Sequence, residues 1–215
     1  LGRSVALKLM PDATAGDRRL VQRFEREAQA AARIRHNGIV EIYDCATHDG
    51  KPFLVMEQLE GETLAQRIAH GPQPPGVCAR ICAELAHAVH AAHCAGIVHR
   101  DLKPDNIVLA LAPPYGERIK VLDFGVAKVL DTDQALTHSD ELMGTPCYMA
   151  PEQLRSAKAA DARSDIYAIG CILYEMLAGR RPFLATSRAE LLLQVRHDDP
   201  PAMQRADVPE ALEQL

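Results

Sequence analysis

The chain has 215 residues, of which 47% are hydrophobic, which is enough to bury the core of one or two domains. Its 24 lysines and arginines against 29 aspartates and glutamates give a net charge of −5, and no long basic run points to nucleic acid or an anionic membrane as the main partner. The longest apolar stretch, 166–178, is interrupted by Glu175 and is too short to span a bilayer, and no signal-peptide pattern begins the sequence.

The six cysteines are scattered without a C-x-x-C pair, which disfavours zinc and a disulfide framework and indicates a reducing, cytoplasmic compartment. His87, His90 and His93 recur at every third residue, but on a helix they drift around the axis, and no carboxylate or thiolate set completes a coordination shell. We therefore predict no metal site at these histidines.

The first predicted element is a strand over 5–9, whose period of two places Ala6 and Lys8 on one face. A single strand lysine is most often exposed to solvent, and this is the alternative to a functional role for Lys8.

A helix is expected over 18–35, where apolar residues recur at helical spacing. Glu27 lies on or beside this apolar stripe and needs a cation if it turns inward. Lys8 is one candidate partner, and a surface pairing with Arg23 or Arg26 is the alternative.

Two further strands are predicted over 36–44 and 52–56, and together with the first they would form a small sheet. Gly61 marks a turn after them. Thr63, followed three residues later by Gln66, has the pattern of a capping box that opens the next helix.

A longer helix is predicted over 77–95, with Gly96 as its stop signal. It leads directly into a polar octet, 99–106, which has apolar residues on both sides. We expect the octet to be a loop anchored in a core at both ends.

The octet carries groups suited to phosphoryl transfer on a loop stiffened by Pro104. Asp101 can accept a hydroxyl proton, Lys103 can offset phosphate charge, and the amide oxygen of Asn106 can ligate a hard cation such as Mg²⁺. The alternative is an ordinary solvated surface turn.

A short strand over 118–122 ends at Asp123 and is expected to pair with the apolar run 107–109 in a hairpin. Asn106 and Asp123 would then lie at the mouth of this hairpin, where their spacing suits metal chelation.

The stretch 126–148 is polar and lacks periodicity, which indicates a long functional or mobile loop. The stretch 165–178 is apolar nearly all round and is predicted to be a buried helix that ends before Gly179. Asp165 at the start of such a helix needs amide donors.

The order of these motifs resembles that of a protein-kinase catalytic domain. The sequences of residues 150–154 and 162–167 are similar to those of the bacterial, eukaryotic-like serine/threonine kinases. Gly144-Thr145-x-x-Tyr148 and the position of Lys103 match the serine/threonine branch. Six motifs carry the resemblance, in order: Val5-Ala6-Leu7-Lys8, Glu27, His99-Arg100-Asp101, Asp123-Phe124-Gly125, Ala150-Pro151-Glu152 and Asp165.

The resemblance implies an α+β, two-lobe protein-kinase fold. The small lobe, 1–56, would hold an antiparallel sheet and one helix; 57–62 would be the hinge; 63–215 would be a mainly helical large lobe. The glycine-rich loop expected before Val5 and the terminal helices of the large lobe are missing from this sequence, so we interpret the chain as a fragment with little or no activity by itself. The arginine that pairs with Glu152 in the family would lie in the missing end, which predicts that Glu152 lacks its partner.

The resemblance also implies that ATP and Mg²⁺, or Mn²⁺ in its place, are bound between the lobes. The residues implied in binding ATP are Ala6 beside the adenine, Lys8 on the α- and β-phosphates and held by Glu27, and Met56, Glu57 and Leu59 at the gatekeeper and hinge. The metal would be held by Asn106 and Asp123.

The reaction implied is transfer of the ATP γ-phosphoryl group to a serine or threonine hydroxyl of a protein substrate. The residues implied in catalysis are Asp101 as the base, Lys103 at the γ-phosphate, Asn106 and Thr145, while His99, Phe124, Glu152 and Asp165 would be structural. A pseudokinase, which binds partners without catalysis, is the alternative.

Regulation is expected through phosphate on Thr137 or Ser139, which would pair with Arg100 and order the loop. We also expect self-association for autophosphorylation, no nucleic-acid partner and no membrane segment within this piece, although the full-length parent could be membrane-anchored elsewhere.

Overall fold

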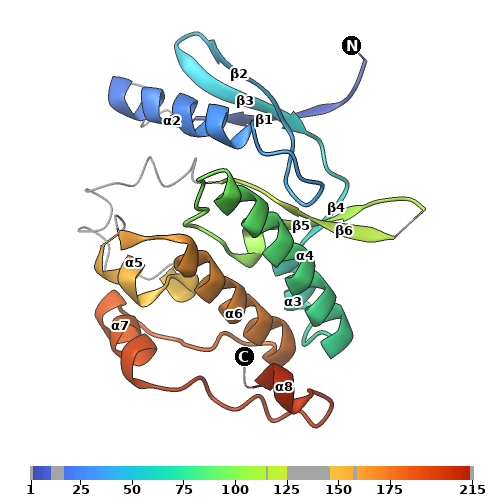
Figure 1. Cartoon of the computed structure of the whole chain (residues 1–215), viewed down its shortest axis with the longest axis vertical. Helices are drawn as coiled ribbons and strands as arrows, with labels where there is room; N and C mark the ends of the chain where they lie inside the picture. Colours follow the sequence, from blue (N-terminus) through green and yellow to red (C-terminus); the bar gives the residue numbers. More distant parts are fainter. Residues whose placement is uncertain (1, 11–16, 115, 125–145, 157–158, 214–215) are drawn as a thin grey trace.

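The computed structural model describes residues 2–10, 17–114, 116–124, 146–156 and 159–213. Figure 1 shows a smaller lobe containing a sheet and one helix at one end, and a larger, mainly helical lobe at the other. The predicted two-lobe α+β architecture is confirmed by this arrangement of the elements.

The small lobe is a three-stranded antiparallel sheet in the order β1-β3-β2, with helix α2 beside it (Figure 1). The elements are β1 (Val5–Leu9), α2 (Arg18–Ala31), β2 (Ile42–His48) and β3 (Lys51–Glu57). Phe24 and Ala28 of α2 form a buried cluster with Leu54 of β3, so the apolar face of the helix holds it to the sheet. The strand predicted over 5–9 is found with the predicted bounds.

The strand predicted over 36–44 is wrong in its first half, since β2 begins only at Ile42. The residues before it form a turn, in which Gly38 N donates to His36 Nδ1 at 3.0 Å. Val40 N then donates to the carbonyl of Val121, so the apolar residues here are buried against the large lobe. The helix predicted over 18–35 also ends early, at Ala31.

The large lobe contains a second antiparallel sheet, β4-β5-β6, and helices packed around it. Its elements are β4 (Gly61–Thr63), α3 (Leu64–Ala69), α4 (Pro75–Cys94), η1 (Pro104–Asn106), β5 (Ile107–Leu111), β6 (Glu117–Val121), η2 (Pro146–Tyr148), α5 (Pro151–Arg155), α6 (Ala162–Ala178), α7 (Arg188–His197) and α8 (Glu210–Glu213). The capping box predicted for Thr63 and Gln66 is present at the start of α3. The predicted hairpin is formed by β5 and β6.

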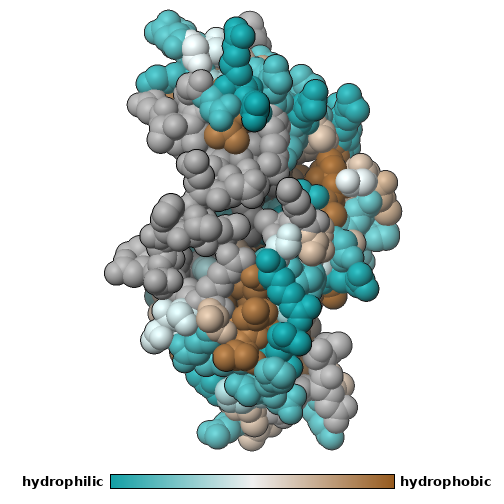
Figure 2. All heavy atoms as spheres, turned by 90° about the vertical axis from the view of Figure 1, so that its left-hand side faces the viewer, coloured by the Kyte–Doolittle hydropathy of each residue, from teal (hydrophilic) through white to brown (hydrophobic). Residues whose placement is uncertain are grey.

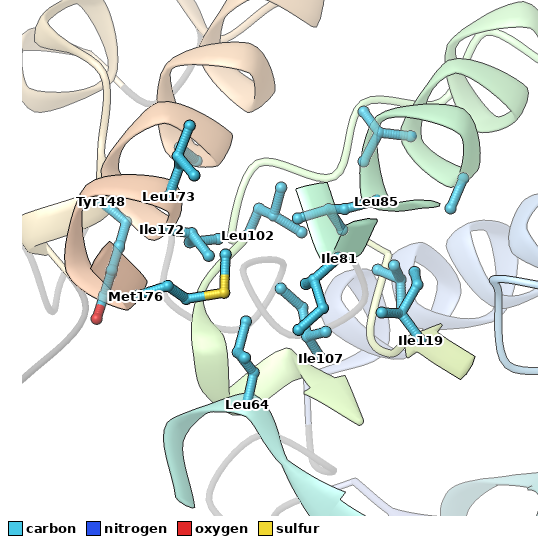
Figure 3. Packing of buried hydrophobic residues seen from close by; sticks show 14 of the residues in the cluster. Leu64, Ile81, Leu85, Leu102, Ile107, Ile119, Tyr148, Ile172, Leu173 and Met176 are labelled. Atoms are coloured by element: carbon cyan, nitrogen blue, oxygen red, sulfur yellow. The ribbon is translucent and has the colours of Figure 1, made fainter. Parts of the chain in front are cut away.

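The core of the large lobe lies between α4, α6 and the β5–β6 hairpin. Figure 3 shows Ile81 and Leu85 of α4 in the same cluster as Ile172 and Met176 of α6, with Ile107 of β5 among them. All five side chains are buried. This packing fixes the end of α4 and the start of β5, and thus both ends of the polar octet.

Helix α6 begins three residues before the predicted 165–178, because Asp161 caps its N-terminus by accepting a hydrogen bond from Arg163 N. It ends at Gly179 as predicted, and this residue has the left-handed φ of 68° that favours glycine. The early start buries Asp165 in the first turns of the helix, where its side chain is 2% exposed.

Helix α7 packs against α5 through a separate apolar cluster around Leu154, Phe183 and Leu191. Leu184 and Leu193 near this cluster are exposed. Figure 2 shows the face of the molecule on which α7 lies in Figure 1, with hydrophobic surface in its lower half. No helix in the described part of the chain is long and apolar enough to cross a bilayer.

Candidate active site

The polar octet is a loop between α4 and β5, as expected, and it brings its polar side chains together at the mouth of the hairpin. Asn106 Nδ2 donates to the carbonyl of Asp101 at 2.8 Å. Lys103 Nζ lies 3.3 Å from Asp101 Oδ2. Leu122 N donates to the carbonyl of Asn106 at 2.8 Å, which places Asp123 beside the loop.

Asp165 holds the backbone of this loop from the start of α6. Its Oδ2 accepts a hydrogen bond from His99 N and its Oδ1 one from Arg100 N, both at 2.9 Å. A third donor is His93 Nε2 of α4, at 2.7 Å from Oδ2. Arg100 has a left-handed φ of 65°, and its carbonyl accepts from Gln153 Nε2 of α5 at 2.9 Å. The conformation just before Asp101 is therefore fixed by hydrogen bonds from α6 and α5, and α4 supports it indirectly by bonding to Asp165.

His99 is fully buried and links the loop to the end of the hairpin. Its Nε2 donates to the carbonyl of Leu122 at 2.8 Å, and its Nδ1 accepts from Asp101 N at 3.3 Å. The ring also packs on Phe124, with 4.8 Å between centroids. These contacts require a neutral imidazole, and burial lowers the pKa of His99 accordingly.

Lys8 of β1 reaches across to the large lobe, where its Nζ lies 2.5 Å from Asp123 Oδ1. The expected Lys8–Glu27 ion pair is not found between these two described residues, so this prediction is corrected. Lys8 and Asp123 are only 32% and 24% exposed, and opposite charges attract strongly where water is partly excluded. Asp123 has a left-handed φ of 59°, which marks a constrained backbone at this point.

The predicted hinge residues lie at the end of β3. Ala6 pairs with Met56 across the β1–β3 register, so the two predicted adenine-side positions are neighbours. Glu57 Oε2 lies 2.7 Å from Lys120 Nζ of β6, which joins the end of β3 to the large lobe. Leu59 is partly buried.

Glu152 at the start of α5 has a hydrogen-bond partner in α6, while the expectation that it lacks its arginine partner stays a prediction. Ser164 Oγ of α6 donates to Glu152 Oε1 at 2.6 Å. The early start of α6 brings Ser164 to this position. The predicted sites Thr137, Ser139 and Thr145 lie outside the described residues, so their pairing with Arg100 and their part in the site stay predictions.

Two contributors were missed by the sequence analysis, His93 and Gln153. The sequence shows that Asp165 needs donors, but nothing in it identifies a histidine 72 residues earlier as one of them. Gln153 follows Glu152 in a helix of only five residues, too short for periodicity to reveal its buried face.

The oxygen donors at the hairpin mouth fit a hard divalent cation. The amide nitrogen of Asn106 is used by Asp101, which leaves the amide oxygen of Asn106 as the group that can ligate a metal. Asp123 supplies a carboxylate beside it. Amide and carboxylate oxygens are the ligands that Mg²⁺ prefers.

Comparisons with known proteins agree with this geometry. A family model described as the protein kinase domain matches residues 1–213. The chain is 40% identical to the serine/threonine-protein kinase Pkn1 of Myxococcus xanthus, over 100% of this chain and 31% of that protein. It is 41% identical to the serine/threonine-protein kinase PknB of Mycolicibacterium smegmatis, over 97% of this chain and 34% of that protein.

Among solved structures, the PknI kinase domain of Mycobacterium tuberculosis is similar, with a TM-score of 0.69 and 30% identity over 100% of this chain and 84% of that chain. The chain therefore spans about a third of the length of these two curated relatives, at 31% and 34%, but most of the solved kinase domain.

Proposed function

Because the chain belongs to the protein kinase domain family, we propose that the protein containing it is a serine/threonine kinase that transfers the γ-phosphoryl group of ATP to serine or threonine hydroxyls of protein substrates. The observation that carries the proposal is the loop held by Asp165, which fixes Asp101 next to Lys103 and Asn106. Such fixed positioning is the main contribution a protein makes to phosphoryl transfer.

Asp101 and Lys103 each have a task in the proposed reaction. Asp101 orients the attacking hydroxyl and accepts its proton. Lys103, 3.3 Å from Asp101 Oδ2, offsets negative charge on the group being transferred. Both charges are held in place before the substrate arrives, so little reorganisation is needed during the reaction.

The cation site and Lys8 complete the proposal. Asn106 and Asp123 would hold Mg²⁺, which when bound would neutralise phosphate charge. Lys8 would contact the α- and β-phosphates, and to do so it must share or leave its contact with Asp123. Ala6 and Met56 would line the adenine end of the cleft.

The compartment proposed is the cytoplasm. All six cysteines are free, which supports a reducing environment for this part of the protein. The proposed partners are proteins that carry the accepting serine or threonine, and a second copy of the kinase during autophosphorylation.

The test is Asp101→Asn in the full-length protein, assayed for ATP-dependent phosphorylation of a generic protein substrate. The variant keeps the shape and removes the base, so we expect kcat to fall at least about a hundredfold, or about 2.7 kcal/mol of barrier. The matched control is Asp105→Asn, an exposed carboxylate in the same polar octet, which should keep wild-type activity. Wild-type turnover by Asp101→Asn would refute the proposal.

A further inference from the structure

A second polar site lies away from the proposed catalytic centre. A groove of about 640 Å³ is formed by α4, β6 and the turn that follows α2. Figure 1 shows α4 and β6 side by side beneath the small lobe. The volume of the groove is within the range of about 300–1,000 Å³ that is typical of small-molecule sites. None of its lining residues takes part in the site described above.

The acidic side chains of the groove are already engaged. Glu84 uses one oxygen for Arg80 at 2.9 Å and the other for the backbone N–H of Ile119 at 3.1 Å. Glu117 uses one oxygen for Arg80 and the other for Arg67, both at 2.9 Å. The hydrogen bond from Arg67, with the help of Arg80, holds the pKa of Glu117 below its ordinary value. Both oxygens of each carboxylate are therefore already engaged by donors of the protein.

The donors of the groove, in contrast, are available. The side chain of Arg118 is exposed, and no ion pair or hydrogen bond joins it to another side chain in the described part of the chain. His36 Nδ1 accepts from Gly38 N, so in the neutral ring the proton is on Nε2, which can donate into the groove. Asn37 and His87 also line the groove and are exposed. The groove thus offers one guanidinium and several neutral donors.

We propose that this groove binds a phosphate monoester. Arg118 would hold the phosphate with its forked guanidinium, and His36 and Asn37 would donate from the turn on the opposite side. A phosphate has three acceptor oxygens and can accept hydrogen bonds from several of the donors that line the groove. The ester could be a free small molecule or a phosphorylated side chain, and the two sources share this chemistry.

The site would join the two lobes. His36 and Asn37 belong to the turn after α2, whereas Arg118 belongs to β6 of the large lobe. The turn already contacts β6, because Val121 N donates to the carbonyl of Gly38 at 2.8 Å. A phosphate held from both sides would brace this junction further.

The experiment is calorimetric titration of the full-length protein, with Mg-ADP at saturation so that phosphate binding in the nucleotide cleft is already satisfied. The probes are inorganic phosphate, glycerol 2-phosphate, a capped tripeptide containing phosphoserine, and its unphosphorylated form. We expect at least one ester to bind and the unphosphorylated peptide not to bind. Preference for glycerol 2-phosphate supports a free ester, and preference for the phosphopeptide supports a protein-borne one.

The variants locate the site. Arg118→Ala and Arg118→Gln should each weaken ester binding at least tenfold, while Arg196→Ala, an exposed arginine of α7, should leave it unchanged. Thermal unfolding should be the same for all three variants, because neither arginine is buried. Hydrogen exchange should slow at 36–40 and 80–88 when the ester binds. Absence of ester binding, or equal affinity in both Arg118 variants and the wild type, would overturn the proposal.

Discussion

At the scale of single residues, the catalytic loop depends on His99 remaining uncharged. Its two ring nitrogens serve the carbonyl of Leu122 and the amide of Asp101, and burial lowers its pKa below the ordinary value of about 6.5. In the unfolded chain the ring takes up a proton near that value, whereas in the folded chain it does so only at lower pH. Stability should therefore be fully present above about pH 6.5 and fall as the pH drops below it. The expected slope is up to about 1.4 kcal/mol per pH unit.

The measurement is denaturant unfolding of the wild type and of His99→Phe between pH 7.5 and 5.5. Phenylalanine fills the same space beside Phe124 but cannot titrate, so this variant should be less stable at pH 7.5 and should lose less stability on acidification. Equal slopes for the two proteins would show that another group governs the acid response.

At the scale of elements, α6 offers two glycines with opposite roles. Gly179 ends the helix at φ 68°, and a Cβ there would lie 2.9 Å from Pro72 Cγ. Gly170 is exposed inside the helix, and a Cβ there would meet nothing within 4 Å. We expect Gly179→Ala to destabilise the protein by about 1–2 kcal/mol or more. Gly170→Ala should stabilise it by up to about 1 kcal/mol, because alanine is the better helix former.

Thermal unfolding distinguishes the two variants, since about 1 kcal/mol corresponds to roughly 2–4 °C for a chain of this size. Gly170→Ala is the matched control, as it makes the same chemical change in the same helix. A shift in the same direction for both would mean that the αL conformation of Gly179 is not what limits its replacement.

The elements also show what local patterns can predict. The strand over 5–9 and the capping box of Thr63 were correct because each rests on neighbouring residues alone. The helix predicted over 77–95 was found at Pro75–Cys94. The strand over 36–44 was wrong over 36–41, because Ile39 and Val40 are apolar for a different reason, burial against β6.

In the candidate site too, the features that depend on neighbouring residues were predicted, and those that depend on the tertiary arrangement were not. Asp101, Asn106 and Asp123 were predicted together because the loop and hairpin that carry them are nearly continuous in sequence. The partner of Lys8 was not predicted correctly, because a long side chain at an interface between lobes can reach several carboxylates. Choosing between Glu27 and Asp123 requires the relative position of α2 and the hairpin, which no local pattern contains.

At the scale of the whole molecule, β6 is one of the elements through which the two lobes contact one another. Ile39 forms a β-bridge with Val121. Lys120 Nζ lies 2.7 Å from Glu57 Oε2 at the end of β3 and 3.4 Å from the carbonyl of Ile39. The end of β3 and the turn before β2 are thus tied to one strand of the large lobe, which ends two residues before Asp123. The position of the small lobe is thereby linked to that of a proposed metal ligand.

The Glu57–Lys120 ion pair should stabilise this junction measurably. The side chains are 26% and 18% exposed, so their attraction is less screened than that of a surface pair. In a double-mutant cycle with Glu57→Gln and Lys120→Met, we expect a coupling free energy of about 1–3 kcal/mol in the free energy of unfolding.

The matched control for this cycle is the pair Arg35–Glu41, whose side chains are 86% and 57% exposed and 3.8 Å apart. A cycle with Arg35→Met and Glu41→Gln should give a coupling of only about 0–0.5 kcal/mol, as exposed ion pairs do. If the Glu57–Lys120 coupling were equally small, the junction would be held by the backbone hydrogen bonds of Gly38 and Val40 with Val121 and by the Lys8–Asp123 ion pair, without a contribution from Glu57 and Lys120. Single replacement of Lys120 would then leave the midpoint of unfolding unchanged.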